Sequence, residues 1–233
     1  MMIAPVLLQL LEDVELNNGL KARLKEQIDS AAVNATSNPR DEIEGNKELL
    51  NAIMVVVLAK LENLYGDGDD TKLYSMPLFV AQPQSRIVPL MEDHGTVAIV
   101  LGEYVRTWED VFYDICHESL HLLNPVINVK GGNVKVSSLE EGCAVNFAEH
   151  MYQKYINPYC DKIPTTSPAN APYSPYFIAY SVTKKIPDGV LKEVRKEFGR
   201  FSKIDDVEKF TALVGGYVSG EEVEVLIKPF PYR

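Results

Sequence analysis

The stretch Cys116-His117-Glu118-Ser119-Leu120-His121 places two histidines and a glutamate close together on a predicted helix. Residues four apart lie on the same face of a helix, so the rings of His117 and His121 would stand about 6 Å apart and could bind one metal ion. Glu118 follows on the same rim, where its carboxylate could take a proton from a metal-bound water without binding the metal itself. An ordinary surface helix that contains these residues by chance is the alternative, and a third ligand would decide between the two.

The helix that carries this motif is predicted from its capping signals and is followed by a second helix. Thr107 is a suitable N-cap for a helix over residues 108–123. Ser137 or Ser138 is a suitable N-cap for the next helix, over residues 139–155. Two helices joined by a short connection can pack side by side, so residues of the second helix can approach the motif.

Two adjacent glutamates at the start of the second helix are candidates for a third ligand. Glu141 lies twenty positions after His121, and Glu140 precedes it. Two histidines alone hold a catalytic zinc poorly, whereas a carboxylate from a neighbouring helix would complete a three-ligand site. The spacing alone does not choose between the two glutamates.

The combined pattern resembles that of the gluzincin metallopeptidases, in which His-Glu-x-x-His is followed by a glutamate ligand on a second helix. The local sequence Glu-Gly-x-Ala that begins at Glu141 is similar to the aminopeptidase branch of that clan. The resemblance implies a zincin-like fold and one Zn2+ ion per chain, held by His117, His121 and Glu141. It also implies that Glu118 is the general base of a zinc-dependent hydrolase that cleaves peptide bonds.

A further resemblance to the same branch lies in the segment Ser174-Pro175-Tyr176-Phe177-Ile178-Ala179-Tyr180. It is similar to a Pro-Tyr-x-x-Gly segment that begins a helix there, with Ala179 in place of the glycine. The family's tyrosine donates a hydrogen bond to the oxyanion, which implies this catalytic role for Tyr176. A phenol facing a metal can stabilise charge that develops on the substrate oxygen. Tyr173 and Tyr180 are the alternatives.

The resemblance covers residues 96–185 and has departures that bear on specificity. The Gly-x-Met-Glu-Asn segment with which aminopeptidases hold a free amine is absent, so endopeptidase and exopeptidase activity both remain open. The resemblance also implies that residues 96–101 form the sheet-edge strand, which would pair with an extended peptide. Val145 stands where many gluzincins have an acidic residue that orients a histidine, and Asp114, one turn before His117, could do this instead.

The rest of the chain predicts an α+β fold, with a small mixed sheet packed on the helix of the motif. A helical N-terminal portion, residues 1–70, is expected to pack as one unit with the metallopeptidase-like portion, residues 71–233. The remaining predicted elements are helices over 3–32 (interrupted at 17–19), 42–65, 176–185, 190–201 and 207–214, and strands over 73–81, 86–90, 96–101 and 222–228.

Composition narrows the classes of function. The net charge of −10 disfavours binding to nucleic acid or to an anionic membrane surface. The longest apolar run, residues 52–59, is far shorter than the ~20 residues that cross a bilayer, and the N-terminus has no cationic leader. Three cysteines favour a reducing compartment, the cytoplasm, and Cys116 and Cys143 are expected to be buried packing residues.

Other candidate sites have simpler interpretations. The acidic run 66–70 lacks the ligand spacing of an EF-hand loop and predicts a solvated turn. His94 and His150 are isolated from other ligand types. A solvated helix face is expected for the basic residues Lys184, Lys185, Lys192, Arg195, Lys196, Arg200 and Lys203.

Two other functions are compatible with the same residues. The chain could be a catalytically silent binding or regulatory module, although Glu118 would then have no use as a base. It could also hydrolyse a non-peptide amide. The sequence carries no signal for an oligomeric state.

Overall fold

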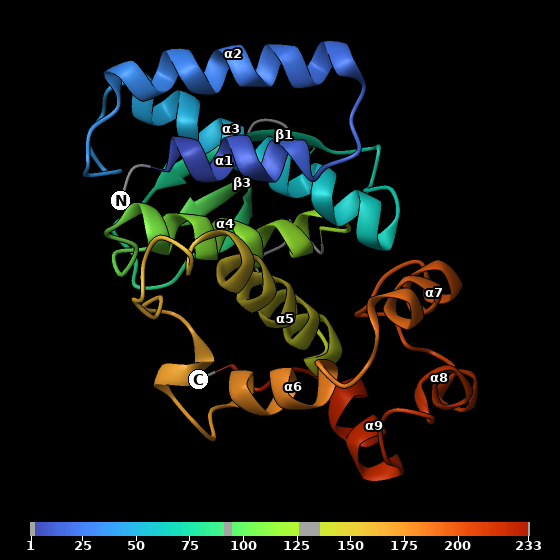
Figure 1. Ribbon diagram of the computed structural model, residues 1–233. Coiled ribbons are helices and arrows are strands. Elements are labelled where there is room, and N and C mark those ends of the chain that lie inside the picture. The colour runs from blue at the N-terminus through green and yellow to red at the C-terminus, as the bar shows by residue number, and fades with distance from the viewer. Residues whose placement is uncertain (1–2, 91–94, 126–135, 233) are drawn as a thin grey trace.

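The computed structural model describes residues 3–90, 95–125 and 136–232, and shows a mixture of helices with one small sheet (Figure 1). It is therefore an α+β protein, as the sequence predicts. His94 and most of the connection between the two central helices lie outside the described residues. Within the described parts, no helix combines the length and apolarity needed to cross a membrane.

Three helices form the N-terminal part of the structure. They are α1 (Ala4–Glu12), α2 (Asn18–Asn34) and α3 (Glu44–Tyr65). The break between α1 and α2 comes before residue 17, earlier than predicted. Asn17 is the N-cap of α2, and its side chain accepts a hydrogen bond from the backbone N–H of Leu20.

The sheet has the strand order β1-β3-β2. Strand β3 (Thr96–Leu101) is parallel to β1 (Leu73–Phe79) and antiparallel to β2 (Arg86–Pro89). The prediction that residues 96–101 form the sheet edge is therefore wrong. From Val97 onward β3 is apolar on both faces and buried throughout, which favours the central position, whereas β2 is the antiparallel edge strand.

After the sheet, the described residues form the α-helices α4 to α9 and a short 3-10 helix, η1 (Pro168–Asn170). The two central ones are α4 (Trp108–Leu122) and α5 (Ser138–Tyr155), both within one residue of the predicted bounds. The C-terminal part contains α6 (Pro175–Thr183), α7 (Asp188–Phe198), α8 (Val207–Val214) and α9 (Gly220–Ile227).

Helix α9 replaces the strand predicted over residues 222–228. Ser219 and Glu222 form a reciprocal capping box at its N-terminus. Val223 and Leu226, three positions apart, are both buried, so the same apolar residues that suggested alternation in fact share one helical face.

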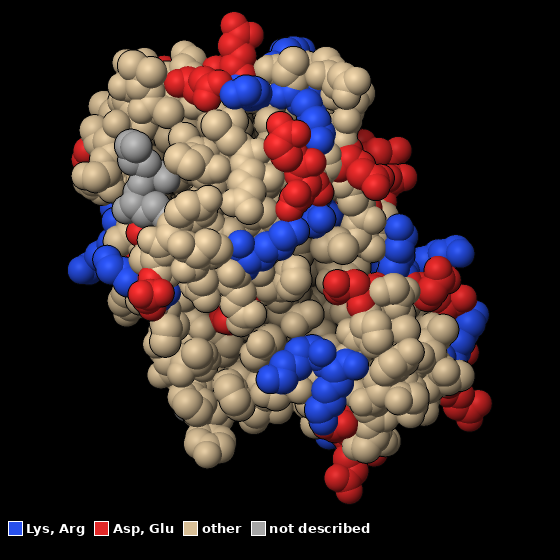
Figure 2. Space-filling model, in the orientation of Figure 1, with Lys and Arg blue, Asp and Glu red and all other residues tan. Residues whose placement is uncertain are grey.

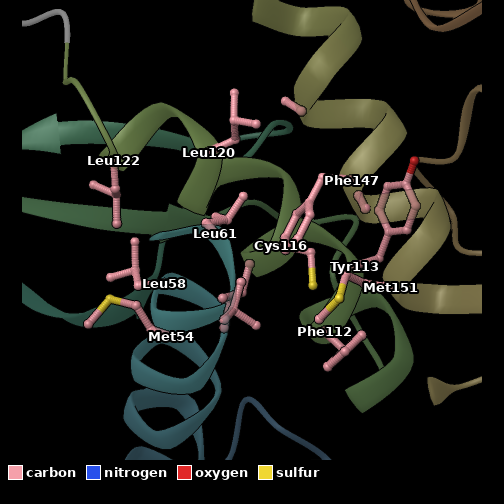
Figure 3. Close-up of a cluster of buried hydrophobic side chains, with 14 of the residues drawn as sticks. Met54, Leu58, Leu61, Phe112, Tyr113, Cys116, Leu120, Leu122, Phe147 and Met151 are labelled. Atoms are coloured by element: carbon pink, nitrogen blue, oxygen red, sulfur yellow. The ribbon is translucent and has the colours of Figure 1, made fainter. Parts of the chain in front are cut away.

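Helices α3, α4 and α5 meet in the hydrophobic core (Figure 3). In this view Met54 and Leu58 of α3 lie near Leu122 of α4, and Phe147 and Met151 of α5 lie on the side of Cys116. Cys116 and Cys143 are both fully buried free thiols, as predicted. The core cluster includes residues from α1 through α9, while the boundary proposed near residue 70 stays a prediction. The core thus holds α4 and α5 in a defined relation, which positions the site.

Arg195 of α7 differs from the solvated cation that the sequence suggested. Its guanidinium is buried and donates hydrogen bonds to Asn124 Oδ1 and to the backbone carbonyls of Tyr65 and Asp67. Burial lowers the pKa of this side chain. The acidic turn after α3 is therefore attached to α7 through its backbone carbonyls.

Replacing Arg195 by Lys is expected to lower the free energy of unfolding by about 2–4 kcal/mol, because an ammonium cannot reach all these acceptors. Urea unfolding followed by circular dichroism measures the change. Lys196→Ala, one position along on the exposed face of the same helix, is the control and should change stability by less than about 0.5 kcal/mol. Equal stability of Arg195→Lys and the parent would contradict the anchoring role.

Candidate metal centre

The capping residues of α4 and α5 place the motif and the two glutamates where the helices meet. The Thr107 side chain accepts a hydrogen bond from the N–H of Asp110, and that of Ser137 accepts one from the N–H of Glu140. Glu140 and Glu141 therefore stand in the first turn of α5, where the helix dipole favours negative charge. Each helix thus begins where the sequence predicts.

His117, His121 and Glu141 come together at this contact. Each offers one ligand atom, and these atoms all lie within 4.8 Å of one another. His117 Nε2 is 3.3 Å from Glu141 Oε2, and His121 Nε2 is 3.6 Å from Glu141 Oε1. In the part of the chain that the structure describes, no second group of His, Cys, Asp or Glu has this arrangement. The three residues could hold one metal ion.

The surroundings of Glu141 fit a cation. Its Oε2 is buried and, among the described residues, has no hydrogen-bond partner, because the nearby His117 nitrogen is close but outside hydrogen-bonding geometry. A buried carboxylate oxygen without a partner is costly. A metal ion between this oxygen and the two rings would remove that cost.

Glu140 has a different role from that of its neighbour. Its Oε1 lies 2.8 Å from Nδ1 of His121, which fixes the orientation of that ring and leaves Nε2 directed toward Glu141. The residue predicted for such a role was Asp114, acting on His117. Asp114 instead accepts hydrogen bonds from the hydroxyls of Ser85 and Thr166.

The segment between α5 and α6 is attached to both central helices. Three consecutive residues donate hydrogen bonds to carboxylates of these helices: Thr165 to Asp110, Thr166 to Asp114 and Ser167 to Glu149. These bonds orient the segment that leads into α6.

The charges at the site stabilise one another. Burial alone would lower the pKa of both histidines, but nearby carboxylates outweigh burial and raise both pKa values. For His117 these carboxylates are Glu141 and Glu118, and for His121 they are Glu141 and Glu140. Burial would raise the pKa of Glu141, yet the two imidazoles hold it well below its usual range. Glu118 is different, because burial is the dominant effect and raises its pKa to about 7.

The raised pKa of Glu118 predicts a pH-dependent stability in the metal-free protein. Its stabilising protonation is present below the unfolded-state pKa of about 4.5 and is lost as the pH rises through about 7. At pH 8, the free energy of unfolding of metal-free Glu118→Gln should therefore exceed that of the parent by at most roughly 3 kcal/mol, which raises its urea midpoint. At pH 4.5 the two urea midpoints should be nearly equal. Urea titrations in a chelating buffer measure this, with the exposed Glu26→Gln as control. A Glu118→Gln effect that is the same at both pH values would contradict the assignment.

Of the three candidate tyrosines, Tyr176 lies against a predicted ligand. Its ring centroid is 6.3 Å from that of His117, and it stands in the first turn of α6. The side chain of Tyr173 is 86% exposed, and the ring of Tyr180 lies under the Lys184 ammonium.

Tyr232 is a site residue that the sequence did not indicate. Its hydroxyl donates a hydrogen bond of 2.6 Å to Glu141 Oε1. Phe230, which is buried, packs at a tilt against Tyr176 and edge-on against Tyr232. The backbone of Pro229 bridges to Ser137 at the start of α5. Ninety-one positions separate Tyr232 from Glu141, so no local pattern could have found it.

The fold and the site together define an α+β protein with three side chains arranged to hold one metal ion beside a buried glutamate. Comparisons with protein-family models, curated proteins and solved structures gave no match. The function is therefore inferred from the geometry of the site.

Proposed function

We propose that the chain is a zinc-dependent hydrolase that cleaves peptide bonds, with a zincin-like arrangement similar to that of the gluzincin metallopeptidases. The observation that carries the proposal is the convergence of His117, His121 and Glu141. Glu118, next to His117 on α4, lies buried beside them. Two histidines and one carboxylate are a ligand set that suits Zn2+ and leaves a coordination position for water or substrate.

In the proposed reaction, Glu118 and Tyr176 would have separate roles. Bound zinc would supply a Lewis acid that polarises the substrate carbonyl and lowers the pKa of water. Glu118, buried beside His117, would accept the proton of the attacking water and later pass it to the leaving amine. Tyr176, whose ring lies against that of His117, would donate a hydrogen bond to the carbonyl oxygen as it becomes negative.

The substrate would be a peptide or protein that lies along the edge of the sheet. Strand β2 is the antiparallel edge strand, and Ser85, just before it, is hydrogen-bonded to Asp114 of α4. An extended peptide added to β2 would therefore run beside the helix that carries the histidines, and backbone pairing would hold it without strong sequence preference.

Incubation with a diverse peptide mixture tests the proposal. We expect new termini to appear with zinc-loaded protein, to be absent after zinc is removed with a chelator, and to return when zinc is added back. The positions of the cuts separate endopeptidase from exopeptidase activity. A zinc-loaded parent that cleaves no peptide would contradict the proposal and favour a binding module or a non-peptide amide substrate.

Tyr232→Phe is expected to weaken zinc binding by roughly tenfold to a hundredfold without unfolding the chain. The change removes only the hydroxyl that holds Glu141 Oε1, so the carboxylate would lose its orienting partner. Competition with a chromophoric chelator measures the affinity. Tyr217→Phe, at an exposed tyrosine between α8 and α9, is the matched control. Unchanged zinc affinity in Tyr232→Phe would show that the hydroxyl does not orient the ligand.

A further inference from the structure

A pocket of about 490 Å3 lies next to the candidate metal centre. Two of its lining residues also touch the centre, since the Tyr176 ring lies against His117 and the Tyr232 hydroxyl is bonded to Glu141. We call it the tyrosine pocket; residues that define it are Gln84, Pro172, Tyr173, Tyr176, Pro231 and Tyr232. Its volume is in the range of pockets that bind small ligands.

The described lining of the tyrosine pocket carries no charged side chain, although 24% of the residues of the chain are charged. In Figure 2 the surface at the lower left, over the segment that leads into α6, is mostly tan, with little red or blue. A charged residue in the pocket would lose water without gaining an ion-pair partner. Tyrosine and proline rings offer flat apolar faces, which pack well against an aromatic ring, and the phenol hydroxyls offer hydrogen bonds.

Tyr173, which lines the tyrosine pocket, has an unusual backbone conformation. Tyr173 has φ of 73°, in the left-handed region, and is the one non-glycine residue of the described chain with a positive φ. Its side chain is nevertheless 86% exposed. Strained backbone of this kind persists where the surrounding structure imposes it, often at ligand-binding sites. Here it presents a large ring that the fold itself leaves mostly uncovered.

The pocket also lies where a bound peptide would pass. Gln84 on one wall comes shortly before the edge strand β2, and Tyr176 and Tyr232 on the other wall adjoin the predicted ligands. A peptide paired with β2 and held at the metal would therefore place one side chain near the pocket mouth.

We propose that the tyrosine pocket binds an uncharged aromatic side chain of a peptide, at a residue close to the bond that is cut. The inference rests on the proposed function for the position of that bond. Its support is the pocket's uncharged tyrosine and proline lining, the exposed Tyr173, and the direct contact of two lining residues, Tyr176 and Tyr232, with the metal centre.

Binding of short peptides to zinc-loaded Glu118→Gln tests the pocket without requiring cleavage. The peptides share one uncharged sequence, in which a single phenylalanine occupies each position in turn, and matched versions carry alanine or lysine there. We expect phenylalanine at one position to bind about tenfold more tightly than alanine, and lysine to bind most weakly. Equal affinity for the three residues at every position would overturn the proposal. Fluorescence anisotropy of labelled peptides measures the affinities.

Tyr173→Gly provides a test in a variant that should remain folded, because glycine suits the left-handed backbone at this position. We expect the preference for phenylalanine over alanine to fall to about twofold or less, with unchanged zinc affinity and melting temperature at or above that of the parent. Tyr217→Ala removes an exposed tyrosine elsewhere and should keep the preference. A preference that is the same in Tyr173→Gly and in Tyr217→Ala would count against the pocket.

The outcomes separate this inference from the proposed function. Cleavage of peptides by the parent without any aromatic preference near the cut would overturn the pocket assignment and leave the hydrolase standing. Position-specific aromatic binding that depends on Tyr173, with no cleavage by the parent, would support the pocket and contradict the hydrolase.

Discussion

Zinc-loaded Glu118→Gln is expected to lose at least about a hundredfold in the rate of peptide hydrolysis while it keeps about one zinc ion per chain. The glutamine amide has nearly the shape of the carboxylate but cannot accept a proton from water. Glu118 is not one of the three converging ligands, so the change leaves the donor atoms of His117, His121 and Glu141 in place. The variant therefore separates catalysis from metal binding.

Initial rates on a peptide that the parent cleaves, together with zinc content by elemental analysis, measure the two effects. Glu26→Gln, the same change at an exposed position of α2, is the control and should hydrolyse the peptide at the parent's rate. Full activity in Glu118→Gln would mean that another group activates the water. Loss of zinc together with loss of activity would mean that Glu118 supports the metal rather than the reaction.

His117→Ala is expected to reduce the zinc content from about one ion per chain to nearly none. Three ligand atoms would become two, and the unpartnered Glu141 Oε2 would lose the imidazole beside it. The protein should be purified without a histidine tag and dialysed against dilute zinc before analysis, with circular dichroism to confirm the fold.

His150→Ala is the matched control for this experiment, because His150 lies exposed on α5, the helix that supplies Glu141. It should retain the zinc content of the parent. Equal zinc in His117→Ala and the parent would remove the site, and with it the proposed hydrolase.

Several features of the site follow from patterns within single helices, and these could be predicted. The caps Thr107 and Ser137 mark the starts of α4 and α5 to within a residue, because their side chains bond to backbone N–H groups three positions on. The shared face of His117 and His121 follows from the helical repeat alone.

Other features depend on which elements lie side by side, and their predictions were wrong or missing. Residues 96–101 were recognisable as a strand, but their central place depends on two partner strands. The orienting role expected of Asp114 falls to Glu140, because side chains one turn apart on α4 face different neighbours. The error over residues 222–228 has a local cause instead, because the Ser219 capping box and a common buried helical face outweigh an alternating pattern.

By itself the sequence determined the helices of the motif, the pairing of His117 with His121, and the presence of a glutamate able to reach them. The resemblance singled out Glu141, and the tertiary structure brings it to the histidines. Only the tertiary structure decided that Glu140 orients His121 and that Tyr232 holds Glu141. The physical reason is the range of the interactions. Helical repeat and capping act over a few residues, whereas contacts between distant segments are selected by the packing of the whole core.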